Sequence, residues 1–409
     1  MPNNLKTKIL NDPIYGFIKI PQGLLFDIIS LPCFQRLRRI RQLGLTNLVY
    51  PGANHNRLQH ALGAMHLMQE AIDVLTLKGV EITQEEAEGV LIAILLHDIG
   101  HGPFSHSLEY NIIDSLTHEE LSLMFMEKIN RRFDGRLTIA IQIFKNTYKK
   151  KFLHQLVSGQ LDTDRLDYLN RDSFFTGVTE GVIGSERIIK MFDVVNDELV
   201  VEEKGIYSVE KFLIARRLMY WQVYLHKTVI SAERLLINIM KRAKELSKTG
   251  GNIFAPPHLQ FFLQTNITQK YITENTETIL QNFSLLDDDD IMSSIKVWMN
   301  SDDKILSTLS RMLVNRNLYK AVLQKHDFDK SEISKIKTDI KKIYNLSDKE
   351  IGYFVSEGTI WNKTYSYDNE NIRILLKSKE IIDITKASDM LNLSFLSKKD
   401  RKYYLCYPK

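Results

Sequence analysis

The chain has 409 residues, a formal net charge of +4, 44% hydrophobic residues and 25% charged residues. These values are ordinary for a globular protein with a large core, and the mild basic balance permits an anionic ligand without requiring one. The two cysteines, Cys33 and Cys406, exclude a disulfide framework and favour a reduced, cytoplasmic setting. The most apolar run, Val90 to Leu96, is too short to span a bilayer, so no membrane partner is expected.

The first half of the chain is predicted to be mostly helical. Asn11-Asp12-Pro13 indicates a turn, and Gly16 favours a hairpin with a strand at residues 14–20. From Leu24 onward the apolar residues recur with helical spacing. Thr83, with Glu86 three residues later, is typical of a capped helix start. Helices are predicted at residues 34–43, 56–77, 84–97, 118–132, 138–146, 152–157 and 162–172, and the first of these is strongly basic.

The second half is predicted to be mixed. A hairpin at 194–209 precedes one long helix at 209–246, and residues 248–252 resemble a linker. Strands are predicted at 372–376 and 381–384. The fold class is therefore mainly α, with small β-hairpins and a mixed α/β C-terminal part, and we expect two domains, residues 1–250 and 251–409.

His97 and Asp98 end an apolar helix and are the first candidate for chemistry. A buried carboxylate is costly unless a partner compensates its charge, and a divalent cation is such a partner. Imidazole and carboxylate together suit iron, zinc, manganese or nickel. For the pair alone, a structural histidine beside a capping acid is the favoured interpretation, and the neighbouring residues change this balance.

Histidines are concentrated around this pair. Arg57 and His60 share one face of the preceding helix. The small residues Ala61, Gly63 and Ala64 would let another helix approach closely. Seven of the 11 histidines fall between residues 55 and 118, which favours a shared role for His55, His60, His66, His97, His101, His106 and His118.

A fourth metal ligand is expected from the segment Asp162 to Tyr168. On the predicted helix, four polar residues share one face and could line a pocket: Asp164, Tyr168, Arg171 and Asp172. A solvated acidic face with internal salt bridges is the alternative interpretation.

Five segments, in this order and with similar spacing, resemble the HD-domain phosphohydrolases, and more narrowly their deoxynucleoside triphosphate triphosphohydrolase branch. The resemblance covers about residues 8–235 and implies an HD-domain helical core. The residues before Asn11 are too few for a SAM domain. The segments are Asn11-Asp12-Pro13-Ile14-Tyr15-Gly16, Phe34-Gln35-Arg36-Leu37-Arg38, Pro51-Gly52-Ala53-Asn54-His55-Asn56-Arg57-Leu58-Gln59-His60, His97-Asp98-Ile99-Gly100-His101-Gly102-Pro103-Phe104-Ser105-His106 and Asp162-Thr163-Asp164-Arg165-Leu166-Asp167-Tyr168.

The resemblance implies roles for individual residues. A divalent transition metal (iron, manganese, zinc or nickel) would be held by His60, His97, Asp98 and Asp164, with magnesium as a further ion at the substrate phosphates. His118 and His101 would act in proton transfer and phosphate contact, with Glu109 as the accompanying acid. The implied substrate contacts are Arg57, Arg165, Tyr168 and Arg216 for phosphates, and Gln42, Asp172 and Tyr224 for the sugar. Plain helix packing is the alternative for Arg216 and Tyr224, which lie at helical spacing with Tyr220.

The implied reaction is hydrolysis of a dNTP to deoxynucleoside and triphosphate by a metal-activated water. Two alternatives remain open: another HD phosphohydrolase, such as a nucleotidase or cyclic-nucleotide phosphodiesterase, and a nucleic-acid-binding protein with a relic site. The family implies a homo-oligomer, a dimer or tetramer, to which residues 251–409 would contribute contacts or regulation. Ser30 departs from the family pattern because an acidic residue there recognises a regulatory guanine, so guanine-specific activation is not expected.

Overall fold

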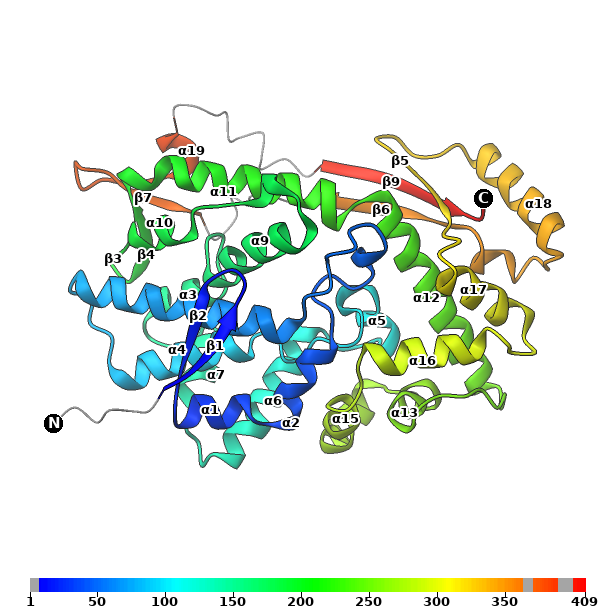
Figure 1. The fold of residues 1–409 in the computed structure, drawn as a ribbon, viewed down its shortest axis with the longest axis horizontal. Coiled ribbons are helices and arrows are strands. Elements are labelled where there is room, and N and C mark those ends of the chain that lie inside the picture. The colour runs from blue at the N-terminus through cyan, green and yellow to red at the C-terminus, as the bar shows by residue number, and fades with distance from the viewer. Residues whose placement is uncertain (1–6, 363–370, 389–399) are drawn as a thin grey trace.

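The computed structural model describes residues 7–362, 371–388 and 400–409, and it is mainly helical, as predicted. Figure 1 shows the helices of the first half gathered at one end of the molecule and helices α12 to α18 at the other. In the described part of the chain, no helix combines the length and apolar character that crossing a membrane requires.

An antiparallel hairpin opens the described chain. Strands β1 (Thr7–Asp12) and β2 (Gly16–Pro21) pair so that Asp12 lies opposite Gly16. One carboxylate oxygen of Asp12 accepts the backbone N–H groups of Ile14 and Tyr15, at 2.9 and 3.2 Å, and closes the turn. The hairpin is thus confirmed near Gly16, although its first strand lies earlier than the sequence pattern indicated.

The basic segment does not form the predicted helix at 34–43. Instead, α2 (Pro32–Gln35) passes into a 3-10 turn, η1 (Arg36–Arg39), and Ile40 is extended. The helix stops because Arg41 pairs with Asn56 as a short antiparallel bridge, beside the backbone hydrogen bond from Gln42 to His55. This bridge places Gln42 next to the start of the following helix.

Three buried helices carry the candidate site, and the sequence predicted each of them closely. These are α3 (Arg57–Leu77), α4 (Gln84–Leu96) and α9 (Thr163–Thr176). Asn56 and Thr83 form reciprocal capping boxes at the starts of α3 and α4, which fixes where these helices begin. The other helices of this half are α1 (Leu24–Ile29), α5 (Glu109–Ile112), α6 (His118–Arg132), α7 (Thr138–Phe144), α8 (Lys151–Val157) and α10 (Ser185–Lys190).

The predicted long helix at 209–246 is interrupted. It consists of α11 (Ile206–Met219), a π-helical turn at Tyr220–Tyr224, and α12 (Lys227–Lys248). Leu225 leaves helical geometry, and the His226 side chain caps the next helix by accepting the backbone N–H of Thr228. No Gly or Pro marks this break, so helical periodicity alone did not predict it. Short π-helical turns are frequent at functional sites.

The strands form two further sheets. The order β3-β4-β7-β8 joins Phe192–Val195, Glu198–Glu202, Arg373–Leu375 and Ile381–Asp383, with β4 and β7 parallel. The predicted strands near 372 and 381 are confirmed. The predicted hairpin at 194–209 is too long: it turns at Asn196 and Asp197, which both have positive φ, and Gly205 directly precedes α11. The second sheet has the order β5-β9-β6: Lys320–Gln324, Asp400–Tyr407 and Ser356–Asn362.

Residues beyond 250 add further helices and contact the core directly. The side chain of Asp288 accepts the backbone N–H groups of Phe104 and Arg41, at 2.8 and 2.9 Å. Because β4 also pairs with β7, the two halves share one sheet, and a domain boundary at residue 250 stays a prediction. The helices are α13 (Pro257–Gln264), α14 (Gln269–Glu274), α15 (Thr276–Phe283), α16 (Asp288–Trp298), α17 (Lys304–Val314), α18 (Lys330–Tyr344) and α19 (Ile384–Ala387).

Arg36 is fully buried and joins three segments. Its guanidinium donates to the backbone carbonyls of Ile99 at 2.8 Å, His101 at 2.9 Å and Leu286 at 3.1 Å. Burial lowers the pKa of Arg36 to about 10, so the side chain still carries its charge at neutral pH. The loop that follows His97 and the start of α16 are therefore held by one side chain.

We predict that Arg36→Met lowers the free energy of unfolding by about 3 kcal/mol, because three buried carbonyls lose their donors. Urea unfolding followed by circular dichroism measures this change. Arg38→Met is the matched control, since Arg38 is exposed and bonds only Gln35 in its own segment; we expect a change below about 0.5 kcal/mol. Equal stability of the two variants would contradict the role given to Arg36.

Candidate metal centre and substrate cavity

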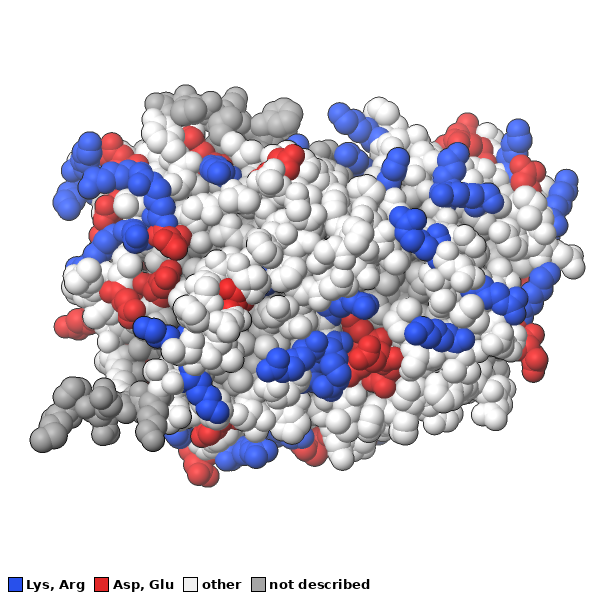
Figure 2. Space-filling view, viewed as in Figure 1, with Lys and Arg blue, Asp and Glu red and all other residues white. Residues whose placement is uncertain are grey.

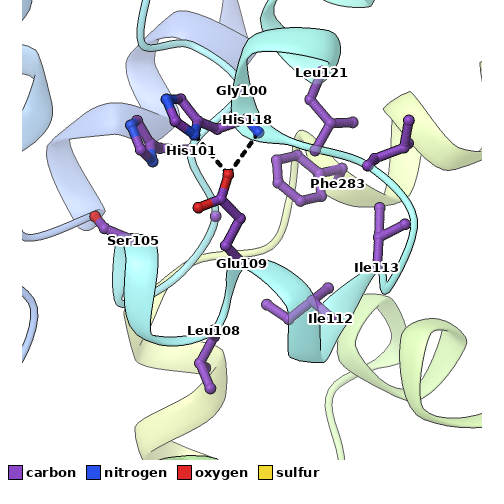
Figure 3. Close-up of a pocket in the computed structure, with 12 residues that line it drawn as sticks. Gly100, His101, Ser105, Leu108, Glu109, Ile112, Ile113, His118, Leu121 and Phe283 are labelled. Carbon is purple, nitrogen blue, oxygen red and sulfur yellow. Dashed lines mark hydrogen bonds and ion pairs between the residues drawn. The ribbon is translucent and has the colours of Figure 1, made fainter. Parts of the chain in front are cut away.

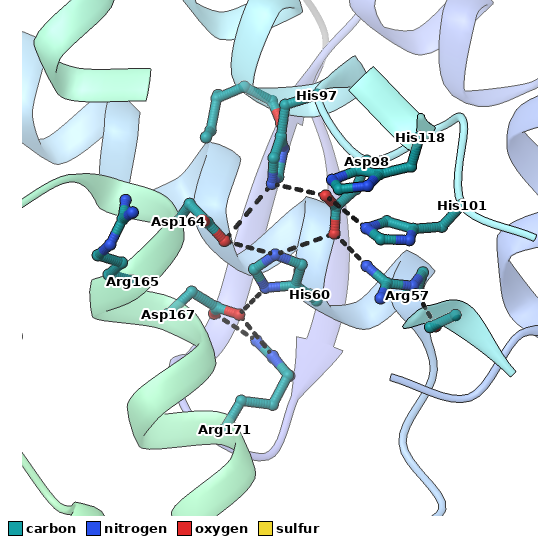
Figure 4. A network of polar contacts seen from close by, with 12 residues as sticks. Arg57, His60, His97, Asp98, His101, His118, Asp164, Arg165, Asp167 and Arg171 are labelled. Carbon is teal, nitrogen blue, oxygen red and sulfur yellow. Dashed lines mark hydrogen bonds and ion pairs between the residues drawn. The ribbon is translucent and has the colours of Figure 1, made fainter. Parts of the chain in front are cut away.

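Helices α3, α4 and α9 bring together the four predicted metal ligands, His60, His97, Asp98 and Asp164 (Figure 4). His60 Nε2 lies 3.0 Å from an Asp164 oxygen and 3.7 Å from an Asp98 oxygen. His97 Nε2 lies 3.5 and 3.3 Å from oxygens of the same two acids. Each of the two imidazole nitrogens thus lies within 3.7 Å of both carboxylates.

The outer nitrogens of the two imidazoles are already used. His97 Nδ1 lies 2.6 Å from the Ile94 carbonyl, and His60 Nδ1 lies 2.8 Å from Asp167. Within the described residues, the Nε2 atoms of His60 and His97 are buried and make no hydrogen bond. Inward-facing nitrogens beside carboxylates are the donor set that iron, manganese, zinc and nickel accept, so these residues fit a divalent transition metal.

The electrostatics of the cluster favour a cation. Burial lowers the pKa of His60, but the neighbouring carboxylates of Asp164 and Asp167 outweigh this effect and raise the pKa to about 10. Burial likewise works against ionised Asp164, yet the adjacent imidazoles of His60 and His97 hold its pKa well below the usual range. Acids that pull a proton onto a buried imidazole would attract a metal ion to the same place.

Arg57 forms a buried ion pair with Asp98 and also donates to the Ser105 hydroxyl at 2.9 Å. Its guanidinium is therefore fixed in the wall beside the metal ligands. Although burial disfavours the charged form of Asp98, the positive charges of His97 and Arg57 keep the pKa of Asp98 well below its usual range.

Gly100 allows α6 to bring His118 into the site. A Cβ at Gly100 would lie 2.2 Å from the His118 carbonyl oxygen and 2.4 Å from the Ser122 nitrogen. Ser122 fastens the contact, because its hydroxyl donates to the His97 carbonyl at 2.7 Å and accepts from the Gly100 N–H at 2.9 Å. The glycine of this motif is thus required by close helix approach.

His118 stacks on His101 and is bonded to Glu109 (Figure 3). The ring centroids of the two histidines are 4.0 Å apart, and His118 Nδ1 lies 2.6 Å from a Glu109 oxygen. That oxygen also accepts the His118 backbone N–H at 2.9 Å. Burial and the neighbouring Arg57 charge lower the pKa of His101 well below its usual value, so it is neutral at neutral pH.

A cavity of about 430 Å³ lies against this centre, a size typical of small-molecule sites. It contains side chains from segments far apart in sequence. Eleven predicted site residues line it: Gln42, Arg57, Asp98, His101, His118, Asp164, Arg165, Tyr168, Asp172, Arg216 and Tyr224.

Asp172 is held by two partners where it lines the cavity. His55 Nε2 lies 2.7 Å from one of its oxygens, and the Tyr224 hydroxyl donates to the other at 2.7 Å. The His55 ring stacks on Phe175 with centroids 4.6 Å apart. Asp172 therefore has a fixed orientation, which suits a group that recognises a hydroxyl.

The structure corrects and extends the predicted site in several places. Arg171 does not line the cavity with Asp164, Tyr168 and Asp172; it is buried and pairs with Asp167 and Asp12. Glu109 lines a smaller adjacent pocket with His101 and His118. Sequence patterns gave no indication of other cavity residues, including Thr46, Ser107 and Glu233. Ser107 and Glu233 are hydrogen-bonded at 2.9 Å, although they are 126 residues apart.

Comparison with family models matches residues 57–172 to the HD domain and residues 183–252 to the HD associated region. The crystal structure of a phosphohydrolase from Bacteroides thetaiotaomicron is 55% identical, with a TM-score of 0.95, and the match covers 99% of this chain and 100% of that one. The uncharacterised protein YwfO of Bacillus subtilis is 31% identical over 98% of this chain and 92% of its own length.

A third relative, the deoxynucleoside triphosphate triphosphohydrolase SAMHD1 homolog of Dictyostelium discoideum, is 29% identical over 77% of this chain and 60% of its own length. The chain therefore belongs to the HD-domain phosphohydrolases, and it is similar to their deoxynucleoside triphosphate triphosphohydrolase branch.

Proposed function

We propose that this phosphohydrolase cleaves dNTPs to deoxynucleoside and inorganic triphosphate. The observation that carries the proposal is the cavity itself. At one place it presents a cluster that fits a divalent metal, and it also presents three arginines together with the fixed carboxylate of Asp172. A dNTP has the matching parts: an anionic triphosphate and a sugar hydroxyl. The Dictyostelium relative named for this activity supports the choice of substrate.

Different side chains have different roles in the proposed hydrolysis. When bound by His60, His97, Asp98 and Asp164, a divalent cation lowers the pKa of water and polarises a phosphoryl oxygen. Arg57, Arg165 and Arg216 offset the negative charge of the triphosphate and orient it. Water adds its oxygen to the α-phosphorus, and the bond to the sugar 5′-oxygen breaks.

In this proposal, His118 protonates the leaving 5′-oxygen. Its Nδ1 is held by Glu109 at 2.6 Å, which fixes the orientation of the ring. The opposite nitrogen, Nε2, is then the position that holds and transfers the proton. His101, stacked on His118 and neutral, is available to contact a phosphoryl oxygen. Asp172, held by His55 and Tyr224, would accept a hydrogen bond from the 3′-hydroxyl of the sugar.

Two other functions use the same residues differently. A nucleotidase or cyclic-nucleotide phosphodiesterase would need the same metal ligands but a shorter anionic group. Nucleic-acid binding through the basic segment 36–41 has less support, because Arg36 is buried and Arg39 is paired with Asp287. On the face in Figure 2, basic side chains are scattered and interspersed with acidic ones. Homo-oligomerisation stays a prediction.

The reaction products distinguish these candidates. We predict that the full-length protein with Mn²⁺ releases inorganic triphosphate and deoxynucleoside from dNTPs, measured by ion chromatography and by ultraviolet detection of the nucleoside. Release of orthophosphate from nucleoside monophosphates, with dNTPs left intact, would contradict the proposal.

We predict that Asp98→Ala abolishes both Mn²⁺ binding and hydrolysis while the far-ultraviolet circular dichroism spectrum is unchanged. Asp98 supplies one of the two carboxylates of the metal cluster. Isothermal titration with Mn²⁺ and the triphosphate assay provide the readouts. His66→Ala is the control, because His66 belongs to the same histidine-rich region but lies outside the cavity, next to Glu70 and Tyr15. An active Asp98→Ala enzyme would refute the assignment.

We predict that Asp172 accounts for recognition of the 3′-hydroxyl. In the wild-type protein, kcat/KM should be at least about 10-fold higher for a dNTP than for the 2′,3′-dideoxy analogue, because the carboxylate is left unpaired without the hydroxyl. In Asp172→Ala this ratio should fall towards 1, with the dNTP losing the most. A ratio that is unaffected by the substitution would show that Asp172 does not recognise the 3′-hydroxyl.

A further inference from the structure

A row of buried charged side chains leads away from the metal cluster behind His60. Asp167 accepts from His60 Nδ1 at 2.8 Å, and Arg171 donates to both oxygens of Asp167 at 2.9 Å. A third nitrogen of Arg171 donates to Asp12 at 2.8 Å. Figure 4 shows Asp167 between His60 and Arg171. His60, Asp167 and Arg171 are completely buried, and Asp12 is 7% exposed.

The outer end of the row is the turn of the β1–β2 hairpin. Asp12 uses one carboxylate oxygen to close that turn and the other to bind Arg171. The Tyr15 ring lies against the same guanidinium, with 5.7 Å between the Arg171 Cζ atom and the ring centroid. The conspicuous segment Asn11 to Gly16 has no part in the cavity, so its packing on Arg171 gives it a separate role.

Gly63 shows that α3 is shaped to admit this row. A Cβ at Gly63 would lie 2.0 Å from an Asp167 oxygen and 2.2 Å from an Arg171 nitrogen. Glycine inside a helix costs about 1 kcal/mol relative to alanine. Here the missing side chain leaves the space in which Asp167 and Arg171 pair, one turn along α3 from His60.

The charges explain why the row behind His60 has three members, Asp167, Arg171 and Asp12. The carboxylate of Asp167 can fix the His60 ring by accepting from Nδ1, which leaves the Nε2 lone pair facing Asp98 and Asp164. A buried carboxylate needs a compensating charge, which Arg171 supplies through two hydrogen bonds. Asp12 engages the third nitrogen of Arg171, so each charged group has a partner.

We propose that Asp167 is a positioning residue for the metal centre, and that Arg171 and the hairpin residue Asp12 hold it in place. This inference rests on the metal-dependent function proposed above. The hairpin thereby supports the orientation of a metal ligand 48 positions later in the chain. Its effect is exerted on His60, without contact between Asp167 and the substrate cavity.

Affinity for Mn²⁺ tests the proposal without relying on activity. Full-length Asp167→Asn, nearly isosteric with the wild type, should bind Mn²⁺ about 10- to 100-fold more weakly in isothermal titration. Asp12→Asn should weaken binding in the same direction by a smaller factor. Because Asp12 contacts neither His60 nor the cavity, it keeps the proposal testable if Asp167→Asn does not fold.

Glu86→Gln is the matched control for loss of a buried ion pair. Glu86 is 1% exposed and bonds Lys150 and the Tyr148 hydroxyl, at the end of α4 opposite His97. This variant should lose stability in thermal unfolding yet retain wild-type Mn²⁺ affinity. In the Co²⁺-loaded proteins, Asp167→Asn should also change the visible ligand-field spectrum, whereas Glu86→Gln should reproduce the wild-type spectrum.

Two negative results have different meanings. Tight Mn²⁺ binding by the wild type with unchanged affinity and spectrum in Asp167→Asn would overturn the positioning role and leave the proposed function intact. A wild-type protein that does not bind Mn²⁺ would overturn the proposed function, and with it the centre that Asp167 serves.

Discussion

Three carboxylates lie side by side where α3, α4 and α9 meet, those of Asp98 and Asp167 buried and that of Asp164 partly exposed, and their charge must be compensated. Asp167 is neutralised by Arg171, and Asp98 is paired with Arg57. Asp164 faces the imidazoles of His60 and His97, and together with Asp167 it raises the pKa of His60. A divalent cation would compensate the same negative charge in place of the proton on His60. The same electrostatic constraint thus accounts for the metal cluster, for the arginine in the cavity wall and for the row behind His60.

The elements around this centre are arranged to hold its loops. Arg36 binds the carbonyls of Ile99 and His101, while Asp288 accepts the N–H groups of Phe104 and Arg41. Phe104 has a left-handed backbone with φ of 53°, and this hydrogen bond helps to keep it there. Residues from beyond 250 therefore fix both loops that line the cavity near His101 and Gln42. A displacement of α16 would therefore shift these loops and change the shape of the cavity.

The sequence predicted the parts of the site that depend on local pattern. The helices carrying His60, His97 and Asp164 have clear apolar periodicity and caps, and their motifs resemble a known family. It could not predict which polar residues would turn inward. Arg36 stands in a run of arginines that looks like a solvated surface, and only the approach of α16 and the 99–101 loop makes it a core residue. Arg171 was assigned to the pocket wall for a similar reason, since its partner Asp12 comes from the distant hairpin.

The break between α11 and α12 was also beyond local patterns, because the residues from 206 to 248 have continuous helical character. Its cause is tertiary: Tyr224 bonds Asp172 on α9, and Tyr50 donates to the Gln222 carbonyl at 2.6 Å. The π-helical turn that results places Tyr220 and Tyr224 along the cavity. A straight helix puts Tyr220 and Tyr224 on one face, as the sequence predicted. It does not predict the π-helical turn that sets their positions along the cavity.

The central claim is that His60, His97, Asp98 and Asp164 together bind one divalent metal ion. Anomalous diffraction from crystals grown with Mn²⁺, recorded at the manganese edge, tests it most directly. The account predicts a single strong anomalous peak bounded by these four side chains, with His60 Nδ1 still on Asp167. Strong Mn²⁺ density elsewhere in the molecule, with none between these residues, would contradict it.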